Sequence, residues 1–536
     1  MLCHEAIACA MSNGGADTLF GVAGDGNLFV AASFAALPGH KYVAAVHESG
    51  AVAMASGYAQ AAGCIGLATV THGPGLTNAM TALIDVVRAG RPLLVVAGDL
   101  GDRRSHAQHL DQELTVAATG AGFLRLASAG SGAECVRKAL DSTVRERRPY
   151  VVSIPVEHLW AEHGDYVDAR RVSPSTAVSK AATDDEIDAA LGVAASAARP
   201  IVLAGVGCAT EAGKTALLAL ARTLGAPVCT TVKAKGLFDG HDESVGIFGT
   251  LSDDVALAII GDSDCVLAFG ASLSTYTTDA GALLKGKSVV HCDIDEDHIG
   301  RFCDVTVSAI GDAPSTAGRM AQILTDAGVS RARWYQAAVG TLEQGRAGDS
   351  TATIDLKSVL EAVNEALPED RMLVTDVGRF FPDAIRSIDV AEPRHYVHGV
   401  NFGSVGLGMG LAVGAAVASP DQTVLLVIGD GGLMMSGLAE FSTAVRTRAN
   451  LVVIVSNDGA YGSEYVQLRD RNWNPSLATF QWPDFAQTAR IFGGYAVSVR
   501  SRVDLQEMVA SLGREARPLL IDVRLDPDSV PRQVRH

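Results

Sequence analysis

Two stretches of the chain decide the fold: Val424-Leu-Leu-Val-Ile-Gly429-Asp430-Gly431-Gly432 and Leu451-Val-Val-Ile-Val-Ser456-Asn457-Asp458-Gly459-Ala460-Tyr461-Gly462. Each is a run of aliphatic residues that ends in a polar, glycine-containing turn, which predicts a buried parallel strand followed by a turn. Adjacent parallel strands joined by one helix bring both turns to the same carboxyl edge of the sheet, where α/β proteins bind ligands. The stretches therefore predict an α/β fold and the place of its site.

The same alternation of strand and helix patterns extends through most of the 536 residues, a length that predicts about three domains. We expect an α/β protein with three doubly wound parallel-sheet domains, at residues 1–168, 184–326 and 354–536, joined by polar segments at 173–183 and 340–353. The clearest predicted strands are 18–22, 42–46, 65–69, 93–97, 150–154, 372–375, 424–428, 451–456 and 519–523.

Composition limits the partners and the compartment. The net charge of -17 and the lack of any lysine or arginine run disfavour nucleic acid and anionic membranes as partners. The 9 cysteines are scattered singly, which favours a reducing compartment over a disulfide framework or a zinc site. No signal segment or membrane-spanning stretch is evident, so we expect a cytoplasmic protein.

The chemistry of the two turns points to a metal and a phosphate group. The carboxylates of Asp430 and Asp458 and a backbone carbonyl near Ala460 are hard oxygen donors, which suit a Mg²⁺ ion that holds a diphosphate. Gly431 and Gly432 permit close approach of the backbone. A single Gly-Asp-Gly turn is more often an ordinary turn after a strand, whereas two such turns at this spacing favour the ligand site.

The paired turns resemble those of the thiamine diphosphate enzymes, in which Gly-Asp-Gly is followed by an Asn-Asn pair; this chain departs from the pattern with Asn457-Asp458. The segment 46–59 also resembles this family, and the resemblance implies that Glu48 bonds the aminopyrimidine ring of the cofactor. Segment 402–410 is similar too, with Val405 in place of the larger apolar residue beneath the cofactor. Further similar segments are 71–75, 198–200 and 291–295. The organisation is most similar to acetolactate synthase, benzoylformate decarboxylase and pyruvate decarboxylase.

The resemblance implies thiamine diphosphate and Mg²⁺ as cofactors, with Asp430, Asp458 and Ala460 as metal ligands. FAD is not expected, because segment 272–279 lacks the arginine-containing stretch of the flavin-binding synthases. The implied cofactor contacts are Gly378, Arg379, Gly403, Ser404, Val405, Gly429, Asp430, Gly431, Gly432, Asp458, Ala460, Tyr461 and Gly462.

The implied reaction is formation or cleavage of a C–C bond of a 2-oxo acid: decarboxylation to an enamine, followed by aldehyde release or by carboligation with an aldehyde or ketone acceptor. The candidate catalytic residues besides Glu48 are Asp25, His72, Gln112 and Glu464. Asp25 and Glu464 favour a decarboxylase, whereas Gln112 favours a synthase. His72 is either a donor to the substrate or a structural histidine, and both interpretations stay open.

Two other classes of function remain. The first is an NAD- or nucleotide-binding oxidoreductase, although no well-placed G-x-G-x-x-G motif supports it. The second is a non-catalytic paralogue that binds thiamine diphosphate, which the presence of Glu48 disfavours. Glu48 and Asp430 lie in different predicted domains, and the family joins such residues across two chains. The resemblance therefore implies a homodimer or homotetramer with active sites at the dimer interface.

Overall fold

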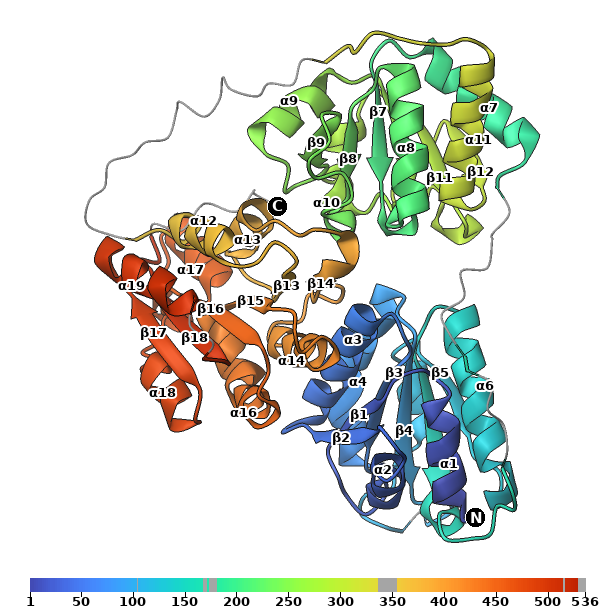
Figure 1. The fold of residues 1–536 in the computed structure, drawn as a ribbon, viewed down its shortest axis with the longest axis vertical. Helices are drawn as coiled ribbons and strands as arrows, with labels where there is room; N and C mark the ends of the chain where they lie inside the picture. The colour runs from blue at the N-terminus through green and yellow to red at the C-terminus, as the bar shows by residue number, and fades with distance from the viewer. Residues whose placement is uncertain (104, 167–170, 173–180, 336–353, 514–515, 529–536) are drawn as a thin grey trace. The chain divides into compact units, whose positions relative to one another are not determined.

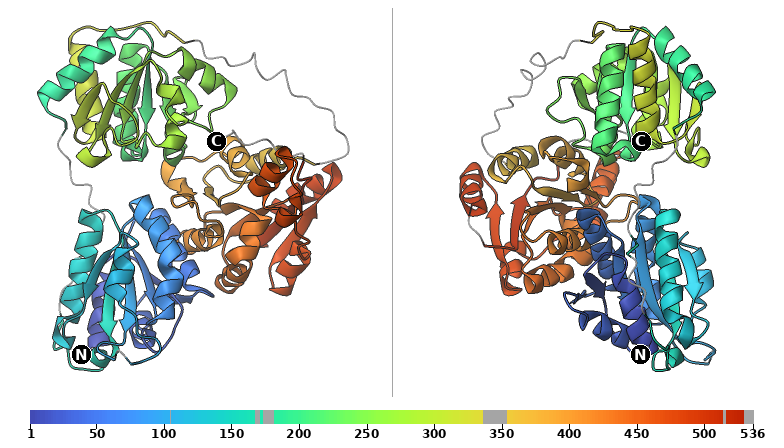
Figure 2. Two further views of the ribbon diagram at one scale, coloured as in Figure 1. Left: turned by 180° about the vertical axis from the view of Figure 1, so that it is seen from behind. Right: turned by 45° about the vertical axis from the view of Figure 1, so that its right-hand side comes forward.

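The computed structural model describes residues 1–103, 105–166, 171–172, 181–335, 354–513 and 516–528. They contain three six-stranded parallel sheets, each covered by helices on both faces (Figures 1 and 2). The predicted class, an α/β protein with three doubly wound parallel sheets, is thereby confirmed. The chain divides into two compact units, one made of residues 1–175, 352–384 and 397–533 and the other of residues 176–351, 385–396 and 534–536.

The first sheet has the strand order β2-β1-β3-β4-β6-β5, and α1 and α6 lie side by side on one of its faces (Figure 1). Its strands are β1 (Thr18–Gly21), β2 (Lys41–Ala44), β3 (Gly66–Val70), β4 (Leu93–Asp99), β5 (Gly122–Arg125) and β6 (Tyr150–Pro155). Its helices are α1 (Cys3–Ser12), α2 (Leu28–Ala35), α3 (Glu48–Ala62), α4 (Pro74–Ala89), α5 (Gln112–Ala117) and α6 (Gly132–Arg145).

The second sheet has the order β12-β11-β10-β7-β8-β9, with α8 packed against α11. Its strands are β7 (Pro200–Ala204), β8 (Val228–Thr230), β9 (Ser244–Ile247), β10 (Cys265–Phe269), β11 (Ser288–Asp293) and β12 (Val307–Ile310). Its helices are α7 (Asp184–Ser196), α8 (Glu211–Leu224), α9 (Asp254–Asp262), α10 (Thr275–Thr278) and α11 (Ala313–Asp326).

The third sheet has the order β14-β13-β15-β16-β18-β17, so the two strands that carry the signature turns, β15 and β16, are neighbours. Its strands are β13 (Met372–Thr375), β14 (Tyr396–His398), β15 (Val424–Gly429), β16 (Leu451–Asn457), β17 (Tyr495–Val499) and β18 (Leu519–Arg524). Its helices are α12 (Leu356–Ala366), α13 (Phe381–Ser387), α14 (Gly408–Ala418), α15 (Asp430–Gly432), α16 (Leu438–Thr447), α17 (Gly462–Asp470), α18 (Phe485–Ile491) and α19 (Arg502–Leu512), with one π-helical turn at Leu433–Gly437.

Helices α3 and α14 cross in direct backbone contact and share one hydrophobic core that spans the first and third sheets. A Cβ atom added to Gly57 would overlap the carbonyl of Leu411, and one added to Gly414 would overlap that of Met54. Glycine at these two positions is therefore what permits so close an approach. The crossing places the first turn of α3, which begins at Glu48, next to α14 and α16 of the third domain.

Most predicted strands agree with the structure within a residue or two. The predicted strand 42–46 ends at Ala44: the Ala45 amide still donates to the Gly21 carbonyl of β1, but the amides of Val46 and His47 donate to Glu440 instead. The predicted linkers lie almost entirely outside the described residues. All 9 cysteines are free thiols. Among the helices that the structure describes, none is long and apolar enough to cross a membrane.

Candidate functional site

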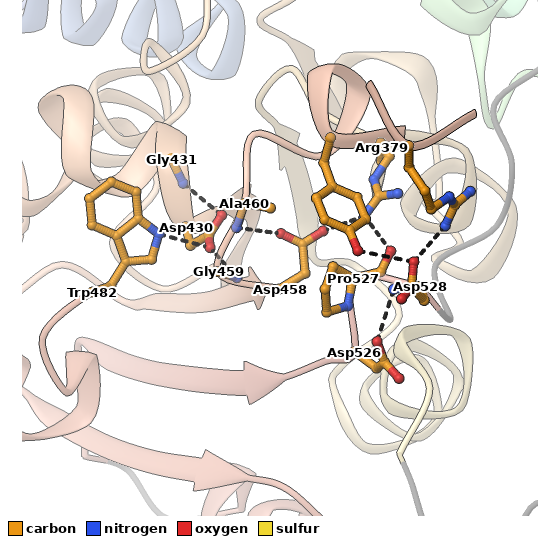
Figure 3. A network of polar contacts seen from close by, with 12 residues as sticks. Arg379, Asp430, Gly431, Asp458, Gly459, Ala460, Trp482, Asp526, Pro527 and Asp528 are labelled. Atoms are coloured by element: carbon orange, nitrogen blue, oxygen red, sulfur yellow. Dashed lines mark hydrogen bonds and ion pairs between the residues drawn. The ribbon is translucent and has the colours of Figure 1, made fainter. Parts of the chain in front are cut away.

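The turns after β15 and β16 share the carboxyl edge of the third sheet, because the strands pair in parallel with Gly429 opposite Ser456. Asp430 directly follows β15 and Asp458 directly follows β16. Their side chains are buried, Asp430 almost completely and Asp458 to a side-chain exposure of 9%. Figure 3 shows the two carboxylates at neighbouring positions within one polar network.

Backbone and indole donors fix the Asp430 carboxylate. Its Oδ1 accepts a hydrogen bond from the Gly431 amide at 2.8 Å, and its Oδ2 accepts from the Gly459 amide at 2.8 Å and from Trp482 Nε1 at 2.9 Å. Burial, and then the nearby Asp458 carboxylate, raise the pKa of Asp430 to about 7. Two close acidic groups in a dry environment are what a divalent cation would stabilise.

The Asp458 carboxylate faces the opposite side of the network. Its Oδ1 accepts from the Ala460 amide at 3.1 Å, and its Oδ2 lies 2.6 Å from Nη2 of Arg379. Arg379 follows β13, and its side chain is only 4% exposed. Three further predicted cofactor contacts lie in this region: Gly378 precedes Arg379, Tyr461 is the N-cap of α17, and Gly462 begins that helix.

A buried aspartate, Asp376, holds the loop that carries Gly403, Ser404 and Val405. Its carboxylate oxygens accept from the Gly406 amide at 2.9 and 3.1 Å and from the Val377 amide at 2.8 Å. Burial raises the pKa of Asp376 to about 7. The loop presents Val405 with 36% of its surface exposed, and a Cβ atom on Gly432 would lie 3.3 Å from a Val405 methyl group. Val405 therefore lies directly over the Asp430 turn.

Glu48 is the first residue of α3 and is buried, with 9% of its surface exposed. Its Oε2 accepts a hydrogen bond from Nδ2 of Asn78 on α4 at 3.0 Å. The two residues before it are held by the other domain, because the amides of Val46 and His47 each donate to Oε1 of Glu440 on α16 at 3.0 Å. The start of α3 is thus fixed by a carboxylate of the third sheet's helices.

His72 and Gln112 converge near Gly98 at the end of β4, and Gly26, the residue after Asp25, lies against both His72 and Gly98. Gln112 Nε2 donates to the Gly98 carbonyl at 2.6 Å, and a Cβ atom on Gly26 would lie 2.9 Å from the His72 ring and 3.1 Å from Gly98 Cα. Both side chains are buried, yet His72 Nδ1 and Gln112 Oε1 have no hydrogen-bond partner among the described residues. Asp25 itself is exposed.

A second histidine extends this group. The His106 ring, from the loop before α5, lies with its centroid 6.1 Å from that of His72, at an edge-to-face angle. His106 is exposed, and nothing in the sequence around it indicates the contact with His72. Glu464 lies exposed on the first turn of α17, and among the described residues it makes no hydrogen bond to His72 or Gln112.

Sequence reasoning missed three residues that shape the site: Asp376, Glu440 and Trp482. None belongs to a recognisable motif, and each acts through a partner distant in sequence, so no local signal could have found them. The region 465–479 contains most of α17 and a 3₁₀ turn at Pro475–Ala478, because tertiary contacts stabilise short helices that propensity alone leaves undecided.

The donor set fits a hard cation bound to a phosphate group. Asp430 and Asp458 supply carboxylate oxygens that retain free lone pairs, and the Ala460 carbonyl is the neutral oxygen predicted to join them. No cluster of three or more His, Cys, Asp or Glu side chains suited to a metal occurs in the described ranges, so a site here would need backbone or ligand oxygens as well. That requirement agrees with Mg²⁺, which is often bound by one or two carboxylates together with phosphate oxygens.

Three family models match consecutive parts of the chain. Residues 1–119 match the N-terminal TPP binding domain of thiamine pyrophosphate enzymes, residues 187–320 match the central domain, and residues 376–523 match the C-terminal TPP binding domain. The matches together span all three sheets.

Individual proteins are similar over almost the whole chain. The acetolactate synthase large subunit of Haemophilus influenzae is 25% identical, with 99% of this chain and 96% of that protein covered. A Pseudomonas aeruginosa protein named "Probable 2-ketoarginine decarboxylase AruI" is 28% identical, with 95% and 90% covered. The structure of Rhodococcus jostii RHA1 thiamine diphosphate-dependent 4-hydroxybenzoylformate decarboxylase has the same fold, with a TM-score of 0.82, 22% identity and 98% and 99% coverage.

Proposed function

Because the chain belongs to the thiamine pyrophosphate enzyme family, we propose that it binds thiamine diphosphate through Mg²⁺ and decarboxylates a 2-oxo acid. The observation that carries this proposal is the position of Asp430 and Asp458, two buried carboxylates at the ends of adjacent parallel strands. When bound, the cofactor supplies a nucleophilic carbon and an electron sink for the loss of CO₂. The protein supplies binding, orientation and proton transfer.

Asp430, Asp458 and the Ala460 carbonyl would hold the metal. The Gly431 and Gly459 amides and Trp482 already fix Asp430, so little reorganisation is needed when a cation binds. The loop held by Asp376 would support the rest of the cofactor, with Val405 beneath it. Gly403 and Gly406 have positive φ angles of 77° and 96°, which glycine adopts without strain and which shape this loop.

Glu48 would bind the aminopyrimidine ring and exchange a proton with it. Its carboxylate has one described hydrogen bond, from Asn78, and therefore keeps an oxygen for the ring nitrogen. Two sets of hydrogen bonds fix its orientation. The Asn78 side-chain amide donates to the Glu48 carboxylate, and the backbone amides of the two preceding residues donate to Glu440. A rigidly held carboxylate loses little entropy when the ring binds.

His72, with Asp25 and His106 nearby, supports aldehyde release as the second half of the reaction. After CO₂ leaves, the former carbonyl carbon must take up a proton before an aldehyde can depart, and an imidazole is the side chain best suited to hold that proton near neutral pH. The unpartnered Nδ1 of His72 is a buried polar atom with capacity for a substrate. We therefore assign His72 as the proton-holding group nearest the substrate.

Carboligation is the second candidate, because of Gln112. Its Nε2 is committed to Gly98, while its buried Oε1 is free to orient a second carbonyl substrate through a bridging hydroxyl or water. Two relatives represent the two outcomes by name, an acetolactate synthase and a 2-ketoarginine decarboxylase. The products of the reaction separate these outcomes.

A homodimer is the proposed working unit, with each Glu48 serving the cofactor held by Asp430 of the other chain. The argument comes from the family resemblance, in which the two binding domains of different chains meet. A larger assembly made of two such dimers is compatible with the same sites.

The test is calorimetric titration of thiamine diphosphate into the metal-free apoprotein with and without Mg²⁺, followed by measurement of CO₂ and aldehyde from a panel of 2-oxo acids. We expect metal-dependent binding, loss of that binding in Asp430→Ala, and CO₂ release from at least one acid. Cofactor binding that ignores Mg²⁺, or no binding at all, would refute the proposal.

A further inference from the structure

Arg379 is a buried cation inside the candidate diphosphate site. Its Nη2 lies 2.6 Å from Asp458 Oδ2 and 3.1 Å from the carbonyl of Pro527. Figure 3 shows these residues in one polar network. Only 4% of its side chain and 9% of that of Asp458 are exposed. An ion pair removed from water to this degree is costly unless all of its hydrogen-bonding groups find partners.

Those requirements are only partly met by the protein. Arg379 Nε and Nη1 are buried and have no hydrogen-bond partner in the described part of the chain. A Cβ atom added to Gly462, the first residue of α17, would collide with Nε, so the free side of the guanidinium lies beneath the start of that helix. A planar guanidinium with free N–H groups matches the oxygens of a phosphate group.

The formal charges of the site also favour Arg379 as a group that faces the phosphate. Asp458 adds a negative charge to a site that already contains Asp430, and a diphosphate adds more. Arg379 is the cation in direct contact with Asp458. Asp430, Asp458 and Arg379 together carry the same formal charge as one aspartate beside two neutral residues.

We propose that Arg379 and Asp458 act as a pair in which Arg379 neutralises the extra carboxylate and donates its free N–H groups to the diphosphate. The pair makes an aspartate acceptable at position 458 and gives the diphosphate a ligand besides the metal. This inference rests on the proposed function, because it assigns a role toward the same cofactor.

The experiment compares five full-length proteins by calorimetric titration with thiamine diphosphate at saturating Mg²⁺: the wild type, Arg379→Gln, Asp458→Asn, the double variant and Arg490→Gln. The last is the matched control, since Arg490 is an exposed arginine of the same domain whose guanidinium donates to the Ala496 carbonyl. Circular dichroism verifies the fold of each protein.

Arg379→Gln is expected to weaken binding by about 10- to 100-fold, which corresponds to loss of hydrogen bonds to a charged group. The double variant is expected to recover only the part of that loss that comes from the unbalanced charge of Asp458, because the hydrogen bonds of the guanidinium stay missing. Arg490→Gln should bind as the wild type does. If Arg379→Gln does not fold, Arg379→Lys replaces it, with retained charge, lost fork geometry and a partial loss of affinity expected.

Two results would overturn the inference: wild-type affinity in the Arg379 variant, or a double variant whose loss equals the product of the two single losses. A wild type that binds no thiamine diphosphate would instead refute the proposed function and this inference with it. A wild type that binds while Arg379→Gln is unaffected refutes the inference alone.

Discussion

Replacing Glu440 with alanine should release the start of α3 and with it Glu48. Glu440 Oε1 accepts the amides of Val46 and His47 at 3.0 Å each, and Oε2 accepts the Thr443 hydroxyl at 2.8 Å. A hydrogen bond to a charged group contributes about 1.5–3 kcal/mol. The protection factor of each amide against hydrogen exchange is therefore expected to fall roughly 10- to 150-fold. Thiamine diphosphate affinity is expected to fall as well, because Glu48 loses its fixed position.

Hydrogen exchange followed by mass spectrometry measures this directly in peptides that cover residues 44–50. Glu440→Gln is the matched control, because its amide oxygen can still accept both backbone bonds and its NH₂ group can donate to Thr443. Exchange in β16 should stay at the wild-type rate in both variants, which separates local release from global unfolding. Unchanged exchange at 44–50 in a folded Glu440→Ala protein would show that this carboxylate does not hold α3.

Four further predictions follow from the site. Because the pKa of Asp430 is raised to about 7, a proton competes with the metal for this carboxylate below that pH. Mg²⁺-dependent cofactor binding should therefore weaken about tenfold from pH 8 to pH 6, after correction for ionisation of the free diphosphate. A flat calorimetric profile over this range contradicts the prediction. Mixing inactive Glu48→Ala and Asp430→Ala chains should restore activity if sites form across a dimer, whereas no recovery in a verified heterodimer argues against it. His72→Ala should reduce aldehyde formation by about a hundredfold while cofactor affinity is kept, and an unaltered product rate would assign His72 a structural role. The purified protein should show no flavin absorption band in the visible range.

The features that could be predicted from the sequence are those encoded by short-range patterns. The aliphatic run before Asp430 and that before Asp458 each predict a strand by themselves, and parallel pairing then brings the turns together. The small residues after Glu48 likewise indicate a closely packed helix, which the α3–α14 crossing explains. Local pattern and global topology agree at these positions.

The features that could not be predicted depend on contacts between distant segments. Asp376 acts on Gly406, and Glu440 acts on Val46 and His47, but neither aspartate nor glutamate carries any sign of its partner in the sequence. Such residues look like ordinary surface acids until the fold buries them. Once buried, these carboxylates accept hydrogen bonds from backbone amides instead of water, and only the structure reveals which amides those are.

The departure at position 458 illustrates how the two kinds of information combine. From the sequence, an aspartate in place of asparagine adds charge and should repel a diphosphate. The fold brings Arg379 within 2.6 Å of that aspartate, from a strand end that local reasoning could not place there. The ion pair cancels the added charge in a buried environment, so the formal charge of Asp430, Asp458 and Arg379 together equals that of Asp430 alone, and Arg379 becomes the proposed second ligand of the diphosphate. The effect of Asp458 on diphosphate binding therefore has to be predicted together with that of Arg379.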